Sequence, residues 1–173
     1  MGRDGSSGRE DEEGVRMLTG KTAVVTGASR GIGIALRFAR EGAHVIVNYN
    51  GSKDRAESVK EEIEKAGGSA QISQCDVSDF AMCESWIQSI IAEHGKIDIL
   101  VNNAGITKDG LLMKMSESDF DQVIATNLKG TFHTIRFVSR QMLKQRSGRI
   151  INLSSVVGVA GNAGQANYAA SKA

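Results

Sequence analysis

The sequence lacks the features that mark membrane-spanning, secreted and nucleic-acid-binding proteins. Its longest apolar runs, such as AVV, HVIV and IDILV, are as long as a strand and much shorter than the roughly 20 residues that cross a bilayer. No basic segment followed by an apolar one opens the chain, as a secretory signal would. The formal charge is only +1, and no basic tract is interleaved with aromatic residues. We therefore expect a cytoplasmic protein with no membrane or nucleic-acid partner.

Cysteine is also scarce. The two cysteines, Cys75 and Cys83, lack the spacing to His44, His94 or His133 that a zinc site needs. Buried thiols in a reducing cytosol are the simpler interpretation. We therefore expect no metal site.

The chain is long enough for one domain. With 173 residues, 40% of them hydrophobic, it can bury a core without disulfides or metals. Residues 1–16, MGRDGSSGREDEEGVR, mix glycine, serine and charge with few apolar side chains, and we interpret them as a disordered tag or linker. A strand-like pattern begins directly after Met17. We therefore predict a single domain over residues 17–173.

From Met17 onward, short apolar runs alternate with longer amphipathic stretches. This alternation is typical of repeated strand and crossover-helix units. The predicted strands are 21–26, 43–47, 70–76, 97–101 and 149–153. The predicted helices are 34–40, 54–66, 79–93 and 117–146. Because such crossovers are right-handed, we expect an α/β fold of the Rossmann type, a doubly wound parallel sheet with helices on both faces and ligands at the carboxyl ends of its strands.

Several helix ends carry capping residues. Ser78 and Ser116 stand where N-caps are expected. Gly67, Gly95 and Gly148 stand just beyond helix ends, where a left-handed conformation is expected.

A glycine-rich turn, TGASRGIG at residues 26–33, follows the first predicted strand and opens a helix. Gly27, Gly31 and Gly33 lack a Cβ, so the backbone can approach a pyrophosphate, and the positive end of the helix offsets its charge. Any tight strand-to-helix turn can use such glycines. The position of this turn after the first strand nevertheless favours a dinucleotide site.

The end of the second strand indicates which dinucleotide is bound. An NAD site usually has an acidic residue there, but this stretch reads VNYNGSK and contains no carboxylate. Arg30, with Asn48 and Lys53, could instead face a 2′-phosphate. This favours NADP over NAD, the alternative being that Arg30 is an ordinary solvated loop residue.

Two further polar turns follow the third and fourth strands. They are CDVSD at 75–79 and NNAG at 102–105. Asp76 could meet the adenine, and the NNAG turn could pass close to the ribose and nicotinamide. Either segment could also be an ordinary turn, since Asp and Asn stabilise turns.

The end of the chain carries candidate catalytic residues. Tyr168 lies thirteen residues beyond Ser155, and Lys172 lies four residues beyond Tyr168. Positions i and i+4 share a helix face, so the phenol and the ammonium can address one site. A nearby cation favours the phenolate and makes the phenol a better proton donor. By itself this spacing is also common in surface pairs.

The motifs occur together in one order, TGASRGIG, CDV, NNAG, ATNLKG, INLSSVVG and NYAASKA. This combination resembles the short-chain dehydrogenase/reductase family over nearly all of residues 17–173. Within that family, VNNAGITKDGLLMKMSESDFDQVIATNLKGTF and GRIINLSSVVGVAGNAGQANYAASKA are most similar to the bacterial 3-oxoacyl-[acyl-carrier-protein] reductases of fatty acid synthesis.

The resemblance implies a catalytic tetrad of Asn127, Ser155, Tyr168 and Lys172. Ser155 would bind the substrate carbonyl, and Tyr168 would protonate its oxygen as hydride arrives from the nicotinamide. Lys172 would hold the ribose hydroxyls, and Asn127, otherwise a mid-helix kink, would anchor a water that relays protons. The implied cofactor-binding residues are Gly27, Ser29, Arg30, Gly31, Ile32, Gly33, Asn48, Asp76, Val77, Asn103, Ala104, Gly105, Tyr168 and Lys172.

The resemblance also implies partners. These are NADPH, an acyl carrier protein bearing a 3-oxoacyl thioester, and further copies of the chain in a homotetramer. Arg146 and Arg149, before the fifth strand, could meet the acidic carrier protein. No metal is implied.

The sequence departs from the family pattern in two places. Family members continue beyond the Tyr-x-x-x-Lys helix into a sixth strand, a proline-glycine turn, a mobile substrate loop and a seventh strand, whereas this sequence ends at Ala173 and contains no proline. The family pattern GIGRAIAL is here GIGIAL, two residues shorter. The loss of two residues rotates the face of a helix by about 200°, so we expect exposed apolar side chains or a reshaped loop.

Two alternatives remain at this stage. One is another member of the family that acts on a sugar, polyol, steroid or polyketide carbonyl. The other is a truncated cofactor-binding module without turnover.

Overall fold

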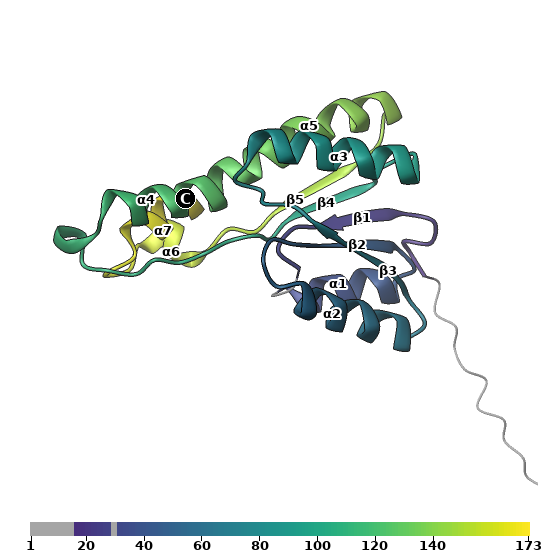
Figure 1. Ribbon diagram of the computed structural model, residues 1–173, viewed down its shortest axis with the longest axis horizontal. Coiled ribbons are helices and arrows are strands. Elements are labelled where there is room, and N and C mark those ends of the chain that lie inside the picture. Colours follow the sequence, from purple (N-terminus) through teal and green to yellow (C-terminus); the bar gives the residue numbers. More distant parts are fainter. Residues whose placement is uncertain (1–15, 29–30) are drawn as a thin grey trace, which may run out of the picture.

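The computed structural model describes residues 16–28 and 31–173. Its centre is a five-stranded parallel sheet with the order β3-β2-β1-β4-β5 (Figure 1). The strands are β1 (Thr22–Val25), β2 (His44–Tyr49), β3 (Ser69–Gln74), β4 (Ile99–Asn102) and β5 (Arg149–Asn152). The predicted Rossmann-type sheet is confirmed, with strand boundaries within two residues of those expected.

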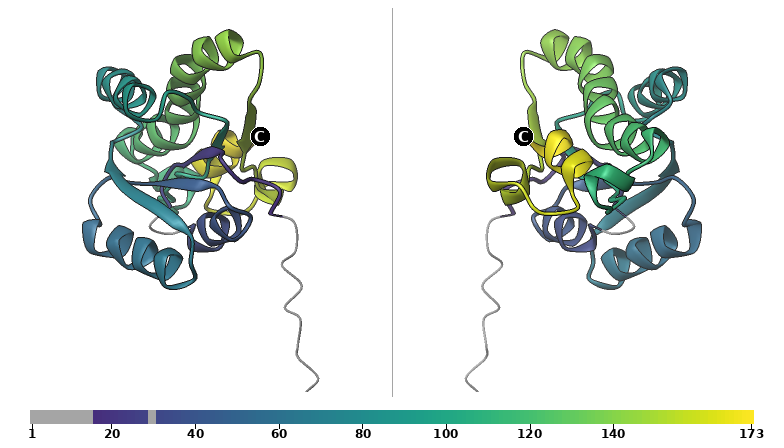
Figure 2. Two further views of the ribbon diagram at one scale, coloured as in Figure 1. Left: turned by 90° about the vertical axis from the view of Figure 1, so that its right-hand side faces the viewer. Right: turned by 90° about the vertical axis from the view of Figure 1, so that its left-hand side faces the viewer.

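Helices cover both faces of the sheet. The helices are α1 (Ile32–Arg40), α2 (Lys53–Lys65), α3 (Phe80–His94), α4 (Glu117–Val123), α5 (Gly130–Gln145), α6 (Val156–Ala160) and α7 (Ala166–Lys172). Figures 1 and 2 show α1 and α2 on one face and α3 and α5 on the other. Beyond the carboxyl ends of β4 and β5, α7 lies beside α4 (Figure 1).

The two faces of the sheet bury separate apolar clusters because side chains alternate along a strand. Val25 and Val47 pack with Ile63 on the side of α1 and α2. Val24 and Leu100 lie in the cluster on the side of α3 and α5. All residues of β1 and β4 are buried, as expected where helices cover both faces of a parallel sheet.

Strand β5 is an exception. Among the described residues it pairs with β4 alone, and all four of its residues are exposed, among them Ile150 and Ile151. This exposed edge is consistent with the expectation that the chain lacks the last strands of the resembled fold.

Helix α1 keeps a buried face despite the shortened GIGIAL segment. It begins directly after Gly31 and buries Ala35 and Ala39, while Ile34 and Phe38 are partly buried against the same cluster. The shortening is therefore accommodated with its apolar residues largely covered, although Ile32 at the helix start is exposed.

Two capping predictions are wrong and three are confirmed. Ser116 caps α4, and Gly67 and Gly95 adopt positive φ as expected. The N-cap of α3 is Asp79, which accepts from the Met82 N–H at 2.9 Å, because the Ser78 hydroxyl instead donates to the Asp76 carboxylate.

After α5, the left-handed residue is Arg146, with φ 52°, and not Gly148. A Cβ on Gly148 would lie within 3.0 Å of three Met142 side-chain atoms. The close packing of Met142 therefore explains a glycine at this position, whereas its backbone conformation does not.

The predicted helix over 117–146 is interrupted. Between α4 and α5 lies a π-helical segment, η2 (Ile124–Lys129), and a short 3₁₀ turn, η1 (Leu112–Lys114), precedes α4. π-helical turns within longer helices often occur at functional sites. Here η2 contains Asn127.

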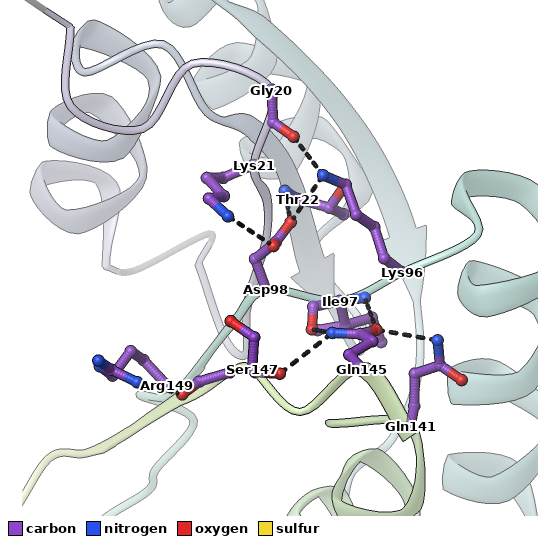
Figure 3. A network of polar contacts seen from close by, with 11 residues as sticks. Gly20, Lys21, Thr22, Lys96, Ile97, Asp98, Gln141, Gln145, Ser147 and Arg149 are labelled. Atoms are coloured by element: carbon purple, nitrogen blue, oxygen red, sulfur yellow. Dashed lines mark hydrogen bonds and ion pairs between the residues drawn. The ribbon is translucent and has the colours of Figure 1, made fainter. Parts of the chain in front are cut away.

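A polar network joins the amino ends of the strands, opposite the candidate site (Figure 3). The Asp98 carboxylate accepts from the Thr22 N–H at 2.9 Å and pairs with Lys21 at 3.1 Å and Lys96 at 3.3 Å. Gln145 connects α5 to the backbone of Ile97. Among the residues described, no helix is both long and apolar enough to cross a membrane.

Candidate active site

The turns that follow β1 and β4 form one hydrogen-bonded unit. Thr26 Oγ1 donates to the Val101 carbonyl at 3.2 Å and accepts the N–H groups of Asn103 and Ala104, both at 3.0 Å. Asn103 Nδ2 donates back to the carbonyls of Thr26 and Gly27, at 2.9 and 3.2 Å. The glycine turn and the NNAG turn therefore hold each other in place at the carboxyl edge of the sheet.

Two glycines are required by this close approach. Gly27 has φ +60°, and a Cβ there would lie 2.8 Å from the Ala104 Cα. A Cβ on Gly31 would lie 2.6 Å from Asn103 Nδ2. A Cβ on Gly33 would meet nothing within 4 Å, so packing within the protein does not explain that glycine.

Asn48 holds the glycine turn in place through hydrogen bonds of its side chain. Its side chain is buried, its Oδ1 accepts the Gly27 N–H at 3.0 Å, and its Nδ2 donates to the carbonyls of Ser73 and Cys75. These bonds occupy both ends of the amide. Asn48 therefore contributes to the site by fixing the turn.

A cavity of about 390 Å³ opens beside these turns. It is lined by Gly27, Asn48, Asn50, Gly51, Ser52, Cys75, Asp76, Val77, Asn103, Ala104, Gly105, Ile106 and Thr126. The structure thus brings together seven of the predicted cofactor-binding residues, while Gly31, Ile32 and Gly33 lie outside this lining. Ser29 and Arg30 lie outside the described residues.

Asp76 has a defined electrostatic role in this cavity. Partial burial acts to raise the pKa of its carboxyl group. Hydrogen bonds from the Ser78 hydroxyl at 2.6 Å, the Ser78 N–H at 2.9 Å and Asn50 outweigh burial and hold the pKa below its ordinary value. Asp76 is therefore an ionised acceptor at neutral pH.

A second cavity of about 290 Å³ continues from the first toward α7. Its lining is Asn103, Gly105, Ile106, Thr107, Leu153, Ser154, Tyr168 and Lys172. Asn103, Gly105 and Ile106 line both cavities, so the two share the turn after β4 as a common wall.

Tyr168 and Lys172 meet at this second cavity, as their spacing predicted. Lys172 is half-buried, and its Nζ donates to the Leu153 carbonyl at 2.8 Å. Burial lowers its pKa from the ordinary value, because the charged form loses solvation. In the described part of the chain, the Tyr168 hydroxyl has no hydrogen-bond partner, so it is free to meet a ligand.

Asn127 lies behind this pair. It is 2% exposed, its Oδ1 accepts the Ile106 N–H at 2.8 Å, and its Nδ2 donates to the Ile106 carbonyl and to Ser171 Oγ. A Cβ on Gly105 would lie 3.4 Å from Asn127 Oδ1 and 3.8 Å from Lys172 Nζ. The π-helical turn therefore places Asn127 at the junction of the NNAG turn and α7.

Ser155, like Asn127, lines neither cavity. Its hydroxyl caps α6 by accepting the Val157 N–H at 3.2 Å. Its neighbour Ser154 lines the second cavity and donates to the Lys172 carbonyl at 2.5 Å. The site thus brings together Tyr168, Lys172 and Asn127, with Ser155 beside it.

Sequence reasoning missed several residues of the site. These are Asn50, Gly51, Ser52, Cys75, Ile106, Thr107, Thr126, Leu153, Ser154 and Ser171. Most directly follow a strand or adjoin a motif, so the signal was their position at the carboxyl edge of the sheet. Ser171 lies inside the NYAASKA motif, but no local pattern indicated its contact with Asn127, which spans 44 residues.

The fold and the site define a dinucleotide-binding protein of the Rossmann class, with a phenol and an ammonium at the far end of the cleft. The chain matches the family described as short chain dehydrogenase over residues 21–173, and it belongs to that family.

Relatives agree with this assignment. A Staphylococcus aureus protein named 3-oxoacyl-[acyl-carrier-protein] reductase FabG is 56% identical over 155 residues, which are 88% of this chain and 63% of the relative. A Thermotoga maritima protein of the same name is 48% identical over 158 residues, covering 90% of this chain and 64% of the relative. The chain therefore spans less than two thirds of the length of these relatives.

Solved structures show the same fold. A short chain dehydrogenase from Mycobacterium avium has a TM-score of 0.82 at 41% identity, covering 90% of this chain and 59% of the other. A gluconate 5-dehydrogenase from Burkholderia cenocepacia J2315, solved in complex with NADP and tartrate, has a TM-score of 0.83 at 34% identity, covering 91% and 62%. The resemblance inferred from the motifs is confirmed.

Proposed function

We propose that this chain is the cofactor-binding and proton-donating part of an NADPH-dependent reductase that converts 3-oxoacyl to 3-hydroxyacyl groups on acyl carrier protein. The observation that carries this proposal is the meeting of Tyr168 and Lys172 at a cavity that shares a wall with the glycine-turn cavity. The names of the relatives support the choice of substrate.

The residues present fit a dinucleotide. The N-terminus of α1 has no side-chain cap and no acidic residue in its first turn, so its N–H groups and positive dipole suit a pyrophosphate. Gly27, Gly31 and Gly33 would lie along that group with Ser29 and Ile32. Asp76 and Val77 would contact the adenine, and the 103–105 turn would lie along the ribose and nicotinamide.

The phosphorylated cofactor fits better than NAD. The cavity residues after β2 are Asn50, Gly51 and Ser52, none of which is a carboxylate that would repel a 2′-phosphate. Arg30 supplies the cation for that phosphate in this proposal. The NADP named with the gluconate 5-dehydrogenase structure is consistent with this choice.

In this proposal, bound NADPH supplies the hydride. Tyr168 donates its proton to the carbonyl oxygen as negative charge develops there, and Ser155 donates a second hydrogen bond to that oxygen. Lys172 holds the ribose hydroxyls and stabilises the phenolate left on Tyr168. Because both ends of the Asn127 amide already make hydrogen bonds, Asn127 acts by holding Ile106 and α7 in place, and a relayed water would bind at its backbone or at Lys172.

The carrier protein requires a docking surface. Arg146 and Arg149 are exposed but lie at the amino end of β5, whereas the cavities lie at its carboxyl end. In this proposal the chain forms a cytoplasmic homotetramer. The carrier protein would contact these arginines on one copy while its acyl group enters the site of a neighbouring copy.

One experiment tests the proposal against its two rivals. NADPH oxidation is followed with acetoacetyl thioester and with gluconate-type substrates, for this chain and for a version extended beyond Ala173 with the remainder of the S. aureus relative. NADPH binding is followed in parallel by nucleotide fluorescence. Tyr168→Phe in the extended version is the matched control, which should bind NADPH and lose turnover.

Thioester turnover by either form, lost in the control, supports the proposal. If the chain turns over only another class of carbonyl compound, that class would take the place of the thioester as the proposed substrate. Binding without turnover in both forms would favour the non-catalytic module, and no binding in either would overturn the cofactor site.

A further inference from the structure

The two thiols of the chain are in contact. Cys75 follows β3 and Cys83 lies in the first turns of α3, and their Sγ atoms are 3.8 Å apart. Both residues are buried, with 1% and 0% exposure, as the sequence suggested. No step of the proposed reduction uses either thiol, so their contact requires a separate account.

The pair lies directly behind the cofactor cavity. Cys75 itself is one of the residues that line that cavity. The Cys75 carbonyl accepts from Asn48 Nδ2 at 3.1 Å, and Asn48 Oδ1 accepts the Gly27 N–H at 3.0 Å. A shift of Cys75 would therefore be passed on to the glycine turn through the side chain of Asn48.

We propose that Cys75 and Cys83 form a reversible disulfide when the chain meets a peroxide, and that this disulfide weakens the NADP cavity. One thiolate attacks the O–O bond of hydrogen peroxide, which gives a sulfenic acid and one water after protonation. The second thiol displaces the sulfenic oxygen as a second water and forms the S–S bond. The two thiols lose two electrons and two protons, and the peroxide is reduced to two waters.

The surroundings favour one partner as the nucleophile. The Cys75 thiol can donate to the Cys83 sulfur, which lowers the pKa of Cys83 against the opposing effect of burial. Nearby Asp76 and Asp79 disfavour thiolates on both residues. The pair should therefore resist low peroxide and respond only at higher concentrations.

Disulfide formation would move Cys75 more than Cys83. A disulfide has an S–S length of about 2.05 Å, so the sulfurs must approach by about 1.8 Å. Cys83 belongs to a 15-residue helix packed through Trp86, Ile87 and Ile90, whereas Cys75 stands at the start of a loop. Moving Cys75 toward α3 costs less free energy than moving the packed helix. This movement pulls the Cys75 carbonyl away from Asn48.

The test is a peroxide titration read in three ways. Intact mass and thiol counting in denaturant should show the loss of two hydrogen masses and both thiols, reversed by dithiothreitol. NADPH fluorescence should report binding weakened by roughly tenfold, the equivalent of losing about 1.4 kcal/mol. Thermal unfolding of the cofactor-free chain should shift between the two redox states.

Cys75→Ala and Cys83→Ala are the matched controls. Each keeps one thiol, so neither should lose two hydrogen masses reversibly, and peroxide should leave the NADPH affinity of each unchanged. Methionine oxidation adds oxygen mass that dithiothreitol does not remove, which separates it from the disulfide.

Two persistent thiols, or a disulfide that links two chains on a non-reducing gel, would overturn the inference. An internal disulfide that leaves the NADPH affinity unchanged would contradict the proposed effect of the disulfide on the cavity. The second half of the inference depends on the proposed NADP site. If the reduced chain does not bind NADPH, that proposal fails, while mass and thermal unfolding still decide whether the disulfide forms.

Discussion

Asn127 Nδ2 donates a 2.9 Å hydrogen bond to Ser171 Oγ, and this bond connects the π-helical turn to the helix that carries Tyr168 and Lys172. Ser171 Oγ in turn donates to the Tyr168 carbonyl at 2.8 Å. The residue before the lysine is therefore a positioning residue for the pair at the cavity.

Ser171→Ala should loosen this connection. The free energy of unfolding should fall by about 1 kcal/mol, because the Asn127 amide loses a buried partner. In the extended form, turnover should fall more than NADPH affinity, since Lys172 and Tyr168 lose their alignment. Urea denaturation and steady-state kinetics measure the two effects. Ser147→Ala, at an exposed position, is the control, and equal behaviour of the two variants would contradict the role of Ser171.

The glycine turn gives a pair of variants with opposite expectations. Gly27→Ala should destabilise the fold by more than about 1 kcal/mol and abolish NADPH binding, since its φ is +60° and its Cβ would overlap Ala104. Gly33→Ala should leave the fold intact or slightly stabilised, because nothing lies within 4 Å of its Cβ and the site is helical.

If a pyrophosphate lies against Gly33, that same variant should lose NADPH affinity without losing stability. Thermal unfolding and nucleotide fluorescence, recorded side by side, separate the two effects. Unchanged affinity in Gly33→Ala would argue against the proposed cofactor pose.

Asp98 should make stability depend on acid pH. Burial acts to raise the pKa of its carboxyl group, but the Thr22 N–H, Lys21 and Lys96 together lower it below the ordinary value of 3.8. A carboxyl group with a lowered folded-state pKa stabilises the fold above its unfolded pKa, and this contribution is lost as pH falls through the folded pKa.

The difference in unfolding free energy between the native chain and Asp98→Asn should therefore be full at pH 7 and shrink below about pH 4. Urea denaturation across this range measures it. Asp121→Asn, at an exposed position, is the control. A constant difference for Asp98→Asn would show that the network in Figure 3 does not act through its charge.

Lys172 should affect stability in the alkaline range. Burial lowers its pKa below the ordinary 10.5, so the folded chain carries the cost of a desolvated charge at neutral pH. This cost disappears as pH rises through the folded-state pKa. The stability of the native chain relative to Lys172→Met should therefore increase between neutral pH and pH 10.5, as measured by urea denaturation at each pH. A flat or falling difference would contradict burial as the cause.

Much of the fold was determined by the sequence itself. Apolar runs of strand length, amphipathic stretches and glycines at Gly67 and Gly95 are local patterns, and local periodicity decides strand, helix and turn. The order of these elements implied a parallel sheet, and parallel strands bring their carboxyl ends to one edge. For the same reason the glycine turn, the NNAG turn and the Tyr168–Lys172 pair were expected near one another.

Only the tertiary structure decided which atoms meet. Ser154 lines the cavity while Ser155 caps a helix, Arg146 takes the left-handed conformation in place of Gly148, and Cys75 touches Cys83. The π-helical turn at Asn127 likewise follows from hydrogen bonds to Ile106 and Ser171, which are 21 and 44 residues away. Such contacts depend on how packed elements are aligned to within an ångström, and local sequence patterns do not specify that alignment.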